Sequence, residues 1–117
     1  MKRNTALVVA LAAISLTAAC GSSVPAPRDQ WAAAQADVGR AEASGASNVP
    51  DARLHLQLAT EDLQKARQLI DADNQRATTL TGLARAEAQL ALSLAKAAAE
   101  QDEASQAQAD LQKAHIK

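Results

Sequence analysis

The sequence of 117 residues contains no Phe or Tyr, a single Trp and a single Cys. One cysteine excludes an internal disulfide, a cysteine-based zinc site and a redox pair of two cysteines. Nucleic-acid binding is not indicated either, because the formal net charge is −1 and clustered basic and aromatic side chains are lacking. The sequence predicts no cofactor, no metal site and no small-molecule substrate.

Strand-forming residues are also scarce, with Val38 and Val49 the only valines after Val24, whereas about a quarter of all residues are alanine. Alanine has the highest helix propensity but buries little apolar area, so helices around a thin core are expected. The predicted fold is all-α: a small antiparallel bundle or hairpin of about three helices with a long C-terminal helix. We divide the chain into a signal peptide (1–19), a lipidated cysteine with a flexible tether (20–28) and a helical domain (29–117).

The N-terminus has the pattern of an export signal. Lys2 and Arg3 precede an uncharged run, Ala6–Ala19, whose fourteen residues are too few for a membrane span of about 20. The end of this run resembles the lipobox of bacterial lipoproteins, in which small residues precede an invariant cysteine: Leu16, Thr17, Ala18, Ala19 and Cys20. The resemblance implies cleavage before Cys20, a diacylglycerol on its thiol and acylation of the new amino terminus. The alternatives are an ordinary signal with Cys20 as a free thiol, and an uncleaved anchor.

Gly21 follows the cysteine at the position where lipoprotein sorting in enteric bacteria uses Asp to retain a protein in the inner membrane. By that resemblance, the chain is expected at the outer membrane, facing the periplasm. The segment Gly21–Pro27 is small, polar and proline-containing, which indicates an extended tether of roughly 20 Å.

Two helices are predicted on either side of Gly45–Pro50. The first covers Asp29–Ser44, with Asp29 as the N-cap and Gly45 just beyond the end. Its apolar face consists of Trp31, Ala34, Val38 and Ala41. The second begins at Pro50, since proline is tolerated in a first turn, and its apolar face consists of Ala52, Leu56, Ala59, Leu63, Ala66 and Ile70.

A turn is predicted at Asp71–Arg76, because Asp73 and Asn74 bond locally and tolerate left-handed geometry, although the unbroken helical phase leaves a continuous helix open. The final helix, near Gln75–His115, continues the same face with Ala77, Leu80, Ala84, Glu87, Ala91, Leu94 and Ala98. It also carries a second row at seven-residue spacing: Leu83, Leu90, Ala97, Ala104 and Leu111. So wide a face suits contact with two neighbouring helices. We therefore expect a three-helix bundle with an overhanging tail, in preference to a long bent hairpin.

The region from about Trp31 to Gln101 resembles the Ala-rich lipoproteins of domain-of-unknown-function family 4398. The residues that carry the resemblance are Val49-Pro50, the spaced residues Leu56, Ala59, Leu63, Ala66, Ala77 and Leu80, and the run LARAEAQLALSLAKAAAEQ at Leu83–Gln101. The family has no established activity. The resemblance therefore implies a helical fold and an envelope location, and nothing about chemistry.

No catalytic constellation is predicted. His55 lies four residues after Asp51 and could bond it, but a nucleophile and an oxyanion hole are not evident. His115, and the run Glu100, Asp102 and Glu103, are interpreted as solvated. Lys117 resembles the terminal lysine that joins the murein lipoprotein to peptidoglycan, although the ending KAHIK lacks that protein's aromatic-basic tail, and a plain charged terminus is the favoured interpretation.

These observations predict a lipid-anchored, non-enzymatic envelope protein with a structural or protein-interaction role. Its expected partners are the membrane, through the N-terminal lipid, and a second copy or an envelope protein. The alternative is a helical adaptor that docks a specific envelope partner or peptidoglycan, since Pro50–Leu83 has the length of one tetratricopeptide unit.

Overall fold

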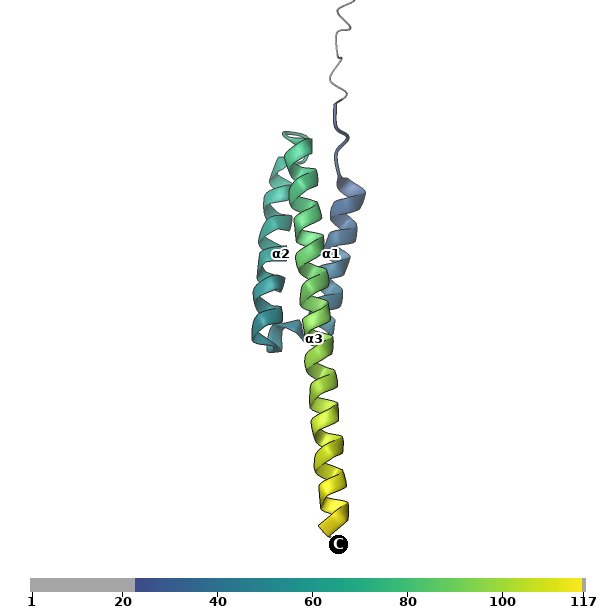
Figure 1. The fold of residues 1–117 in the computed structure, drawn as a ribbon. Helices are drawn as coiled ribbons and strands as arrows, with labels where there is room; N and C mark the ends of the chain where they lie inside the picture. The colour runs from purple at the N-terminus through teal and green to yellow at the C-terminus, as the bar shows by residue number, and fades with distance from the viewer. Residues whose placement is uncertain (1–22, 117) are drawn as a thin grey trace, which may run out of the picture.

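The computed structural model describes residues 23–116. Three helices are present in this part: α1 (Arg28–Ala43), α2 (Pro50–Leu69) and α3 (Asn74–Ile116), with a short 3-10 turn, η1 (Ala46–Asn48), before α2. α1 and α2 lie on either side of the first half of α3, and the second half of α3 continues alone beyond them (Figure 1). The all-α prediction is confirmed, and the three-helix bundle with an overhanging tail is correct, whereas the bent hairpin is wrong.

α1 begins one residue earlier than predicted and is not capped by Asp29. Pro27 occupies the N-cap position, and its carbonyl accepts the backbone N–H of Trp31 at 2.8 Å. Asp29 lies in the first turn instead, where its charge favours the positive end of the helix dipole. The predicted face is confirmed, because Ala34, Val38 and Ala41 are buried and Trp31 packs against them.

The turn between α1 and α2 follows the prediction. Gly45 has a φ of 83°, the left-handed geometry that glycine adopts without steric cost at the end of a helix. Val49 is extended and Pro50 opens α2. The predicted face of α2 is buried from Ala52 to Ala66, while Ile70 is only partly buried because α2 ends at Leu69.

The turn between α2 and α3 is also present, so the continuous helix is wrong. The residue in left-handed geometry is Asp71, with a φ of 73°, and not Asp73 or Asn74. The Asn74 side chain accepts the backbone N–H of Asp71 at 2.8 Å, and the Asp73 carboxylate accepts that of Arg76 at 3.0 Å. Both side chains therefore fix the turn by bonding backbone donors, which is the local bonding that the sequence predicted.

The buried face of α3 differs from the predicted one. Ala77, Ala84 and Ala91 are buried as expected, but the second buried row consists of Thr81, Ala88 and Ala95. The row predicted to be buried is exposed throughout: Leu83, Leu90, Ala97, Ala104 and Leu111. Most of the side chains buried between the helices are those of alanine, so methyl groups fill most of the space between them. The leucines lie outside that contact.

The core is accordingly thin. Apart from Pro27, the buried apolar side chains larger than alanine among the described residues are Val38, Leu56 and Leu63, and each is still 6–8% exposed. Beyond Ala98, all residues of α3 up to Ile116 are exposed, a tail of about 27 Å at 1.5 Å per residue. The bundle therefore occupies one end of α3 and leaves the other uncovered.

Candidate functional site

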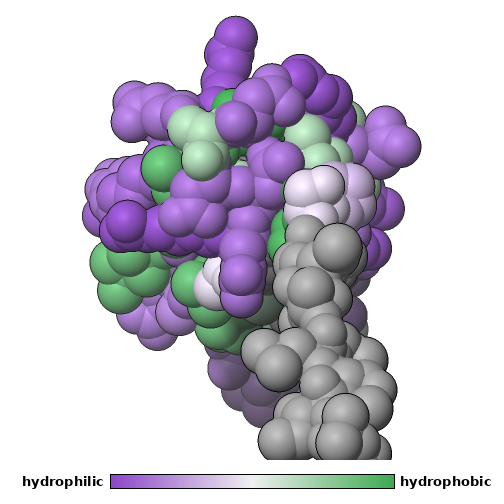
Figure 2. Space-filling view, turned by 90° about the horizontal axis from the view of Figure 1, so that it is seen from above, coloured by the Kyte–Doolittle hydropathy of each residue, from purple (hydrophilic) through white to green (hydrophobic). Residues whose placement is uncertain are grey.

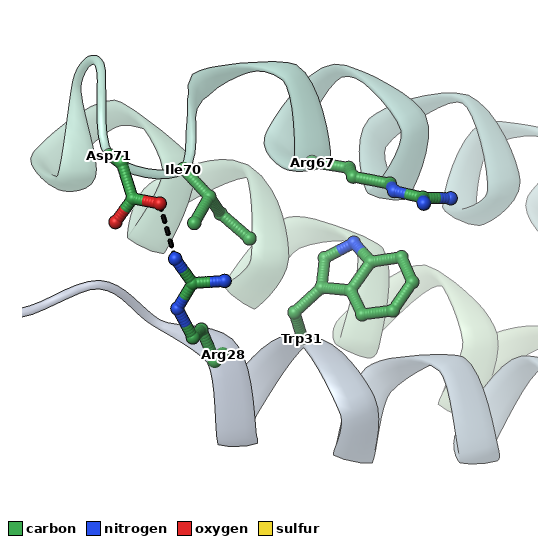
Figure 3. Close-up of a pocket in the computed structure, with 5 residues that line it drawn as sticks. All are labelled: Arg28, Trp31, Arg67, Ile70 and Asp71. Atoms are coloured by element: carbon green, nitrogen blue, oxygen red, sulfur yellow. Dashed lines mark hydrogen bonds and ion pairs between the residues drawn. The ribbon is translucent and has the colours of Figure 1, made fainter.

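An open groove runs between α1 and α2, and Trp31 lies in it (Figure 3). The indole Nε1 donates a hydrogen bond to the Leu63 carbonyl at 2.9 Å, and the Arg67 guanidinium lies 5.8 Å from the ring centroid. This contact places a cation over an aromatic face, an interaction of about 0.5–1 kcal/mol at an exposed site. Trp31 thereby joins α1 to α2.

The groove closes at one end with an ion pair between Arg28 and Asp71, beside Ile70 (Figure 3). Both charged side chains are about two-thirds exposed, so the pair contributes little stability. This part of the groove has a volume of about 390 Å³ and opens to solvent. The charged groups that line it contact one another or the indole ring: Arg28 pairs with Asp71, and Arg67 lies over Trp31.

A buried carboxylate, Asp37, joins α1 to α3. It is 4% exposed and accepts hydrogen bonds from Arg40 of the same helix and from Arg85 Nε of α3 at 3.1 Å. Gln89 Nε2 lies 3.5 Å away. A buried charge is tolerated only when it is paired in this way, so the group orients α1 on α3. Sequence analysis missed it, although Asp37 directly precedes a core valine and lies three residues before an arginine.

His55 bonds Glu87 and not Asp51, the partner that its spacing along α2 made possible. Its Nδ1 lies 2.5 Å from Oε2 of Glu87, across the contact between α2 and α3. The same contact explains the acidic residue that interrupts the apolar face of α3. Glu87 is partly buried there because it has a partner, and the pair serves to align the two helices.

An exposed apolar surface surrounds this pair. We call Leu83, Leu90, Ala97, Ala104 and Leu111 the outer row of α3; its three leucines are 51%, 43% and 69% exposed. On α2, Leu54 and Leu58 lie before and after His55 in the sequence and are 54% and 38% exposed. On α3, Leu83 and Leu90 lie before and after Glu87 in the same way. Seen along the bundle (Figure 2), the surface is largely hydrophilic, and hydrophobic residues gather in separate patches. The outer row places exposed apolar side chains along the length of α3.

The predicted lipidation and cleavage residues lie outside the described part of the chain, as does Lys117: Leu16, Thr17, Ala18, Ala19, Cys20 and Gly21. His115 and the run Glu100, Asp102 and Glu103 are exposed on the overhang. Within residues 23–116, no three His, Cys, Asp or Glu side chains gather to hold a metal ion. None of the helices described has an apolar stretch long enough to span a bilayer.

The fold and these surfaces define a class: an alanine-cored three-helix bundle whose third helix projects from one end. The family model for the domain of unknown function DUF4398 matches residues 29–109, which covers the bundle and most of the overhang. The chain belongs to this family, as its resemblance suggested. No curated protein and no solved structure matches the chain.

Proposed function

We propose that this chain is a lipid-anchored, non-enzymatic protein of the bacterial cell envelope that acts through its helical surface. The observation that carries the proposal is the position of Cys20, directly after a signal-like apolar run and directly before the tether. Two or three acyl chains, at about 0.8 kcal/mol per buried methylene, would hold such a protein at a membrane permanently. With Gly21 after the cysteine, the proposed location is the outer membrane, facing the periplasm.

The direction of the helices supports this proposal. The described chain enters α1 at the end of the bundle where α2 turns into α3, and α3 leaves the bundle at the opposite end (Figure 1). Asn74 Nδ2 donates to the Val24 carbonyl at 2.9 Å, so the chain before α1 contacts this same turn. A lipid at Cys20 would hold the bundle close to the membrane and direct the overhang away from it, where other envelope components lie.

The proposal predicts that Cys20→Ser releases the chain from the membrane. Lipid labelling of the full chain should be lost, and the protein should move from the membrane fraction to the soluble fraction on cell fractionation, because the thiol is the acylation site. Ser22→Ala is the matched control, since it changes a neighbouring polar residue and leaves the thiol. Unchanged labelling and membrane association of Cys20→Ser would contradict the anchor.

A second candidate is the adaptor that docks a particular envelope protein, and the exposed leucines of α2 and α3 favour it. The two candidates differ in what the surface contacts. Cross-linking in cells that yields one different protein in constant ratio would support the adaptor, whereas contacts between copies of this chain would support the structural role.

A further inference from the structure

The outer row is a continuous apolar face that no other described element covers. Its members recur every seven residues over four repeats, from Leu83 beside the bundle to Leu111 near the end of the overhang. A straight α-helix has 3.6 residues per turn, so a strict repeat of seven drifts by about 20° each time unless the helix winds around a partner. This spacing is the one that a left-handed pair of helices uses.

Most charged side chains of the overhang lie away from this face; Glu100, four residues before Ala104, is the exception and stands at its edge. Asp102 lies two residues before Ala104, and Lys113 two residues after Leu111, which turns each by about 200° at 100° per residue. The residues four positions after Ala97 and Ala104 are Gln101 and Gln108, which are polar but uncharged. The overhang therefore has one face suited to contact and another suited to water.

The buried face of the bundle does not continue into the overhang, whereas the outer row does. The buried row of Thr81, Ala88 and Ala95 reaches Asp102 at its next position. Charge at this position ends the face that α1 and α2 cover. The outer row is thus the apolar row that runs through both halves of α3, and Leu54 and Leu58 of α2 widen it beside the bundle.

We propose that a second copy of this chain binds along the outer row, with the two α3 helices parallel and in register. In that arrangement each row residue meets its own equivalent, and the amides of Gln101 and Gln108 can bond their equivalents across the contact. A polar residue at such a core position fixes register and favours dimers. Parallel helices also keep both α1 N-termini at one end, as two anchors in one membrane require; this clause rests on the proposed function.

The size of the contact makes the pair weak in free solution. The row is about 42 Å long at 1.5 Å per residue, and a helix of about 10 Å diameter offers roughly 400 Å² along it. Two copies then bury roughly 800 Å², below the 1,200–2,000 Å² of stable complexes. Two chains held in one membrane have a raised effective concentration, so pairing is expected there first.

Disulfide cross-linking of the full chain in membranes tests the proposal. With Ala104→Cys, mild oxidation should convert most of the chain to a dimer of twice its mass. Gln106→Cys is the matched control, because it lies on the same overhang but about 200° around the helix from Ala104, and it should remain monomeric. The unaltered chain controls for Cys20.

Three results would overturn the proposed pair. Equal cross-linking of Ala104→Cys and Gln106→Cys, or none by either, would show that the outer row is not an interface between copies. A product of Ala104→Cys with a different protein would replace the second copy by that partner. Cross-links between Leu90→Cys and Ala104→Cys chains, with neither linking to itself, would show an antiparallel pair.

The anchor and the pair fail separately. Ala104→Cys is therefore also measured with Cys20→Ser in the same chain, purified and concentrated. If Cys20→Ser leaves membrane association unchanged while Ala104→Cys still links selectively, the anchor is wrong and the pair stands. If Cys20→Ser releases the chain but Ala104→Cys links in neither preparation, the anchor stands and the pair is wrong.

Discussion

Methyl groups make up most of the core at the scale of single residues. Ala34, Ala59 and Ala84, one from each helix, are completely buried. Side chains this small allow the helix axes to come close, and protein interiors packed to such density tolerate additional volume poorly. The position of an alanine in this bundle therefore matters more than its small buried area suggests.

Enlarging a buried alanine should destabilise the bundle. Ala84→Leu adds three carbons at a completely buried position of α3, and overpacking of this kind costs about 1–3 kcal/mol. Ala109→Leu, on the exposed overhang, is the control and should change the free energy of unfolding by less than about 0.5 kcal/mol. Urea unfolding followed by circular dichroism measures both. An equal effect of the two substitutions would argue against a close-packed core at Ala84.

The same packing explains which residues sequence analysis placed wrongly. Leucine is a better predictor of a core position than threonine or alanine, so Leu83 and Leu90 were expected inside and Thr81 was not. In a core made mostly of methyl groups the order reverses on α3: Thr81 is 2% exposed, whereas Leu83 and Leu90 are 51% and 43% exposed. The partners of Asp37 and His55 could not be predicted either, because Arg85 and Glu87 are 48 and 32 residues away from them.

At the scale of elements, the two turns were predicted with different success. Gly45 was identified because one glycine follows a clear apolar face, and it has the expected positive φ. The second turn holds three residues that tolerate left-handed geometry, Asp71, Asp73 and Asn74, and local propensity does not distinguish among them. At Asp71 the turn is fixed by the Asn74 side-chain oxygen, which accepts the Asp71 backbone N–H, while the Asp73 carboxylate accepts that of Arg76 and caps the next helix.

Substitution of two glycines by alanine should have opposite effects. Gly45→Ala puts a Cβ into left-handed geometry, which costs about 1–2 kcal/mol. Gly82→Ala lies inside α3, where an added Cβ meets nothing within 4 Å, and it should stabilise by about 0.5–1 kcal/mol. Thermal unfolding of the two variants gives the signs. A stabilising Gly45→Ala would show that the turn does not require its present backbone.

For the whole molecule, the decisive feature is the length of α3. At 1.5 Å per residue it is about 64 Å long, which is longer than either of the helices packed on it. Its length and the bundle could be predicted, because the breaks at Gly45–Pro50 and Asp71–Arg76 leave one long uninterrupted segment. Within the part of the chain that the structure describes, all the buried residues lie between Pro27 and Ala95. The bundle is therefore expected to fold without the overhang.

Shortening α3 should therefore leave the stability of the bundle unchanged and weaken the pairing of copies. A chain that ends at Gln101 keeps all the buried residues, so its free energy of unfolding at low concentration should stay within about 0.5 kcal/mol of the longer chain. Pairing should make the stability of the longer chain rise with concentration, and this rise should be smaller in the shortened chain because two of the five outer-row residues, Ala104 and Leu111, are gone. Circular dichroism over a range of concentrations measures both properties. A large loss of stability at low concentration would show that the overhang supports the bundle.

Trp31 also determines the intrinsic fluorescence of this protein. The sequence contains no tyrosine and no other tryptophan, so ultraviolet fluorescence from this protein comes from one indole. That indole stands on α1, bonds a carbonyl of α2 and lies under Arg67. Its emission therefore reports the docking of α1 on α2. Circular dichroism, by contrast, reports mainly α3, so the protein carries an internal probe that distinguishes release of its first helix from melting of the rest.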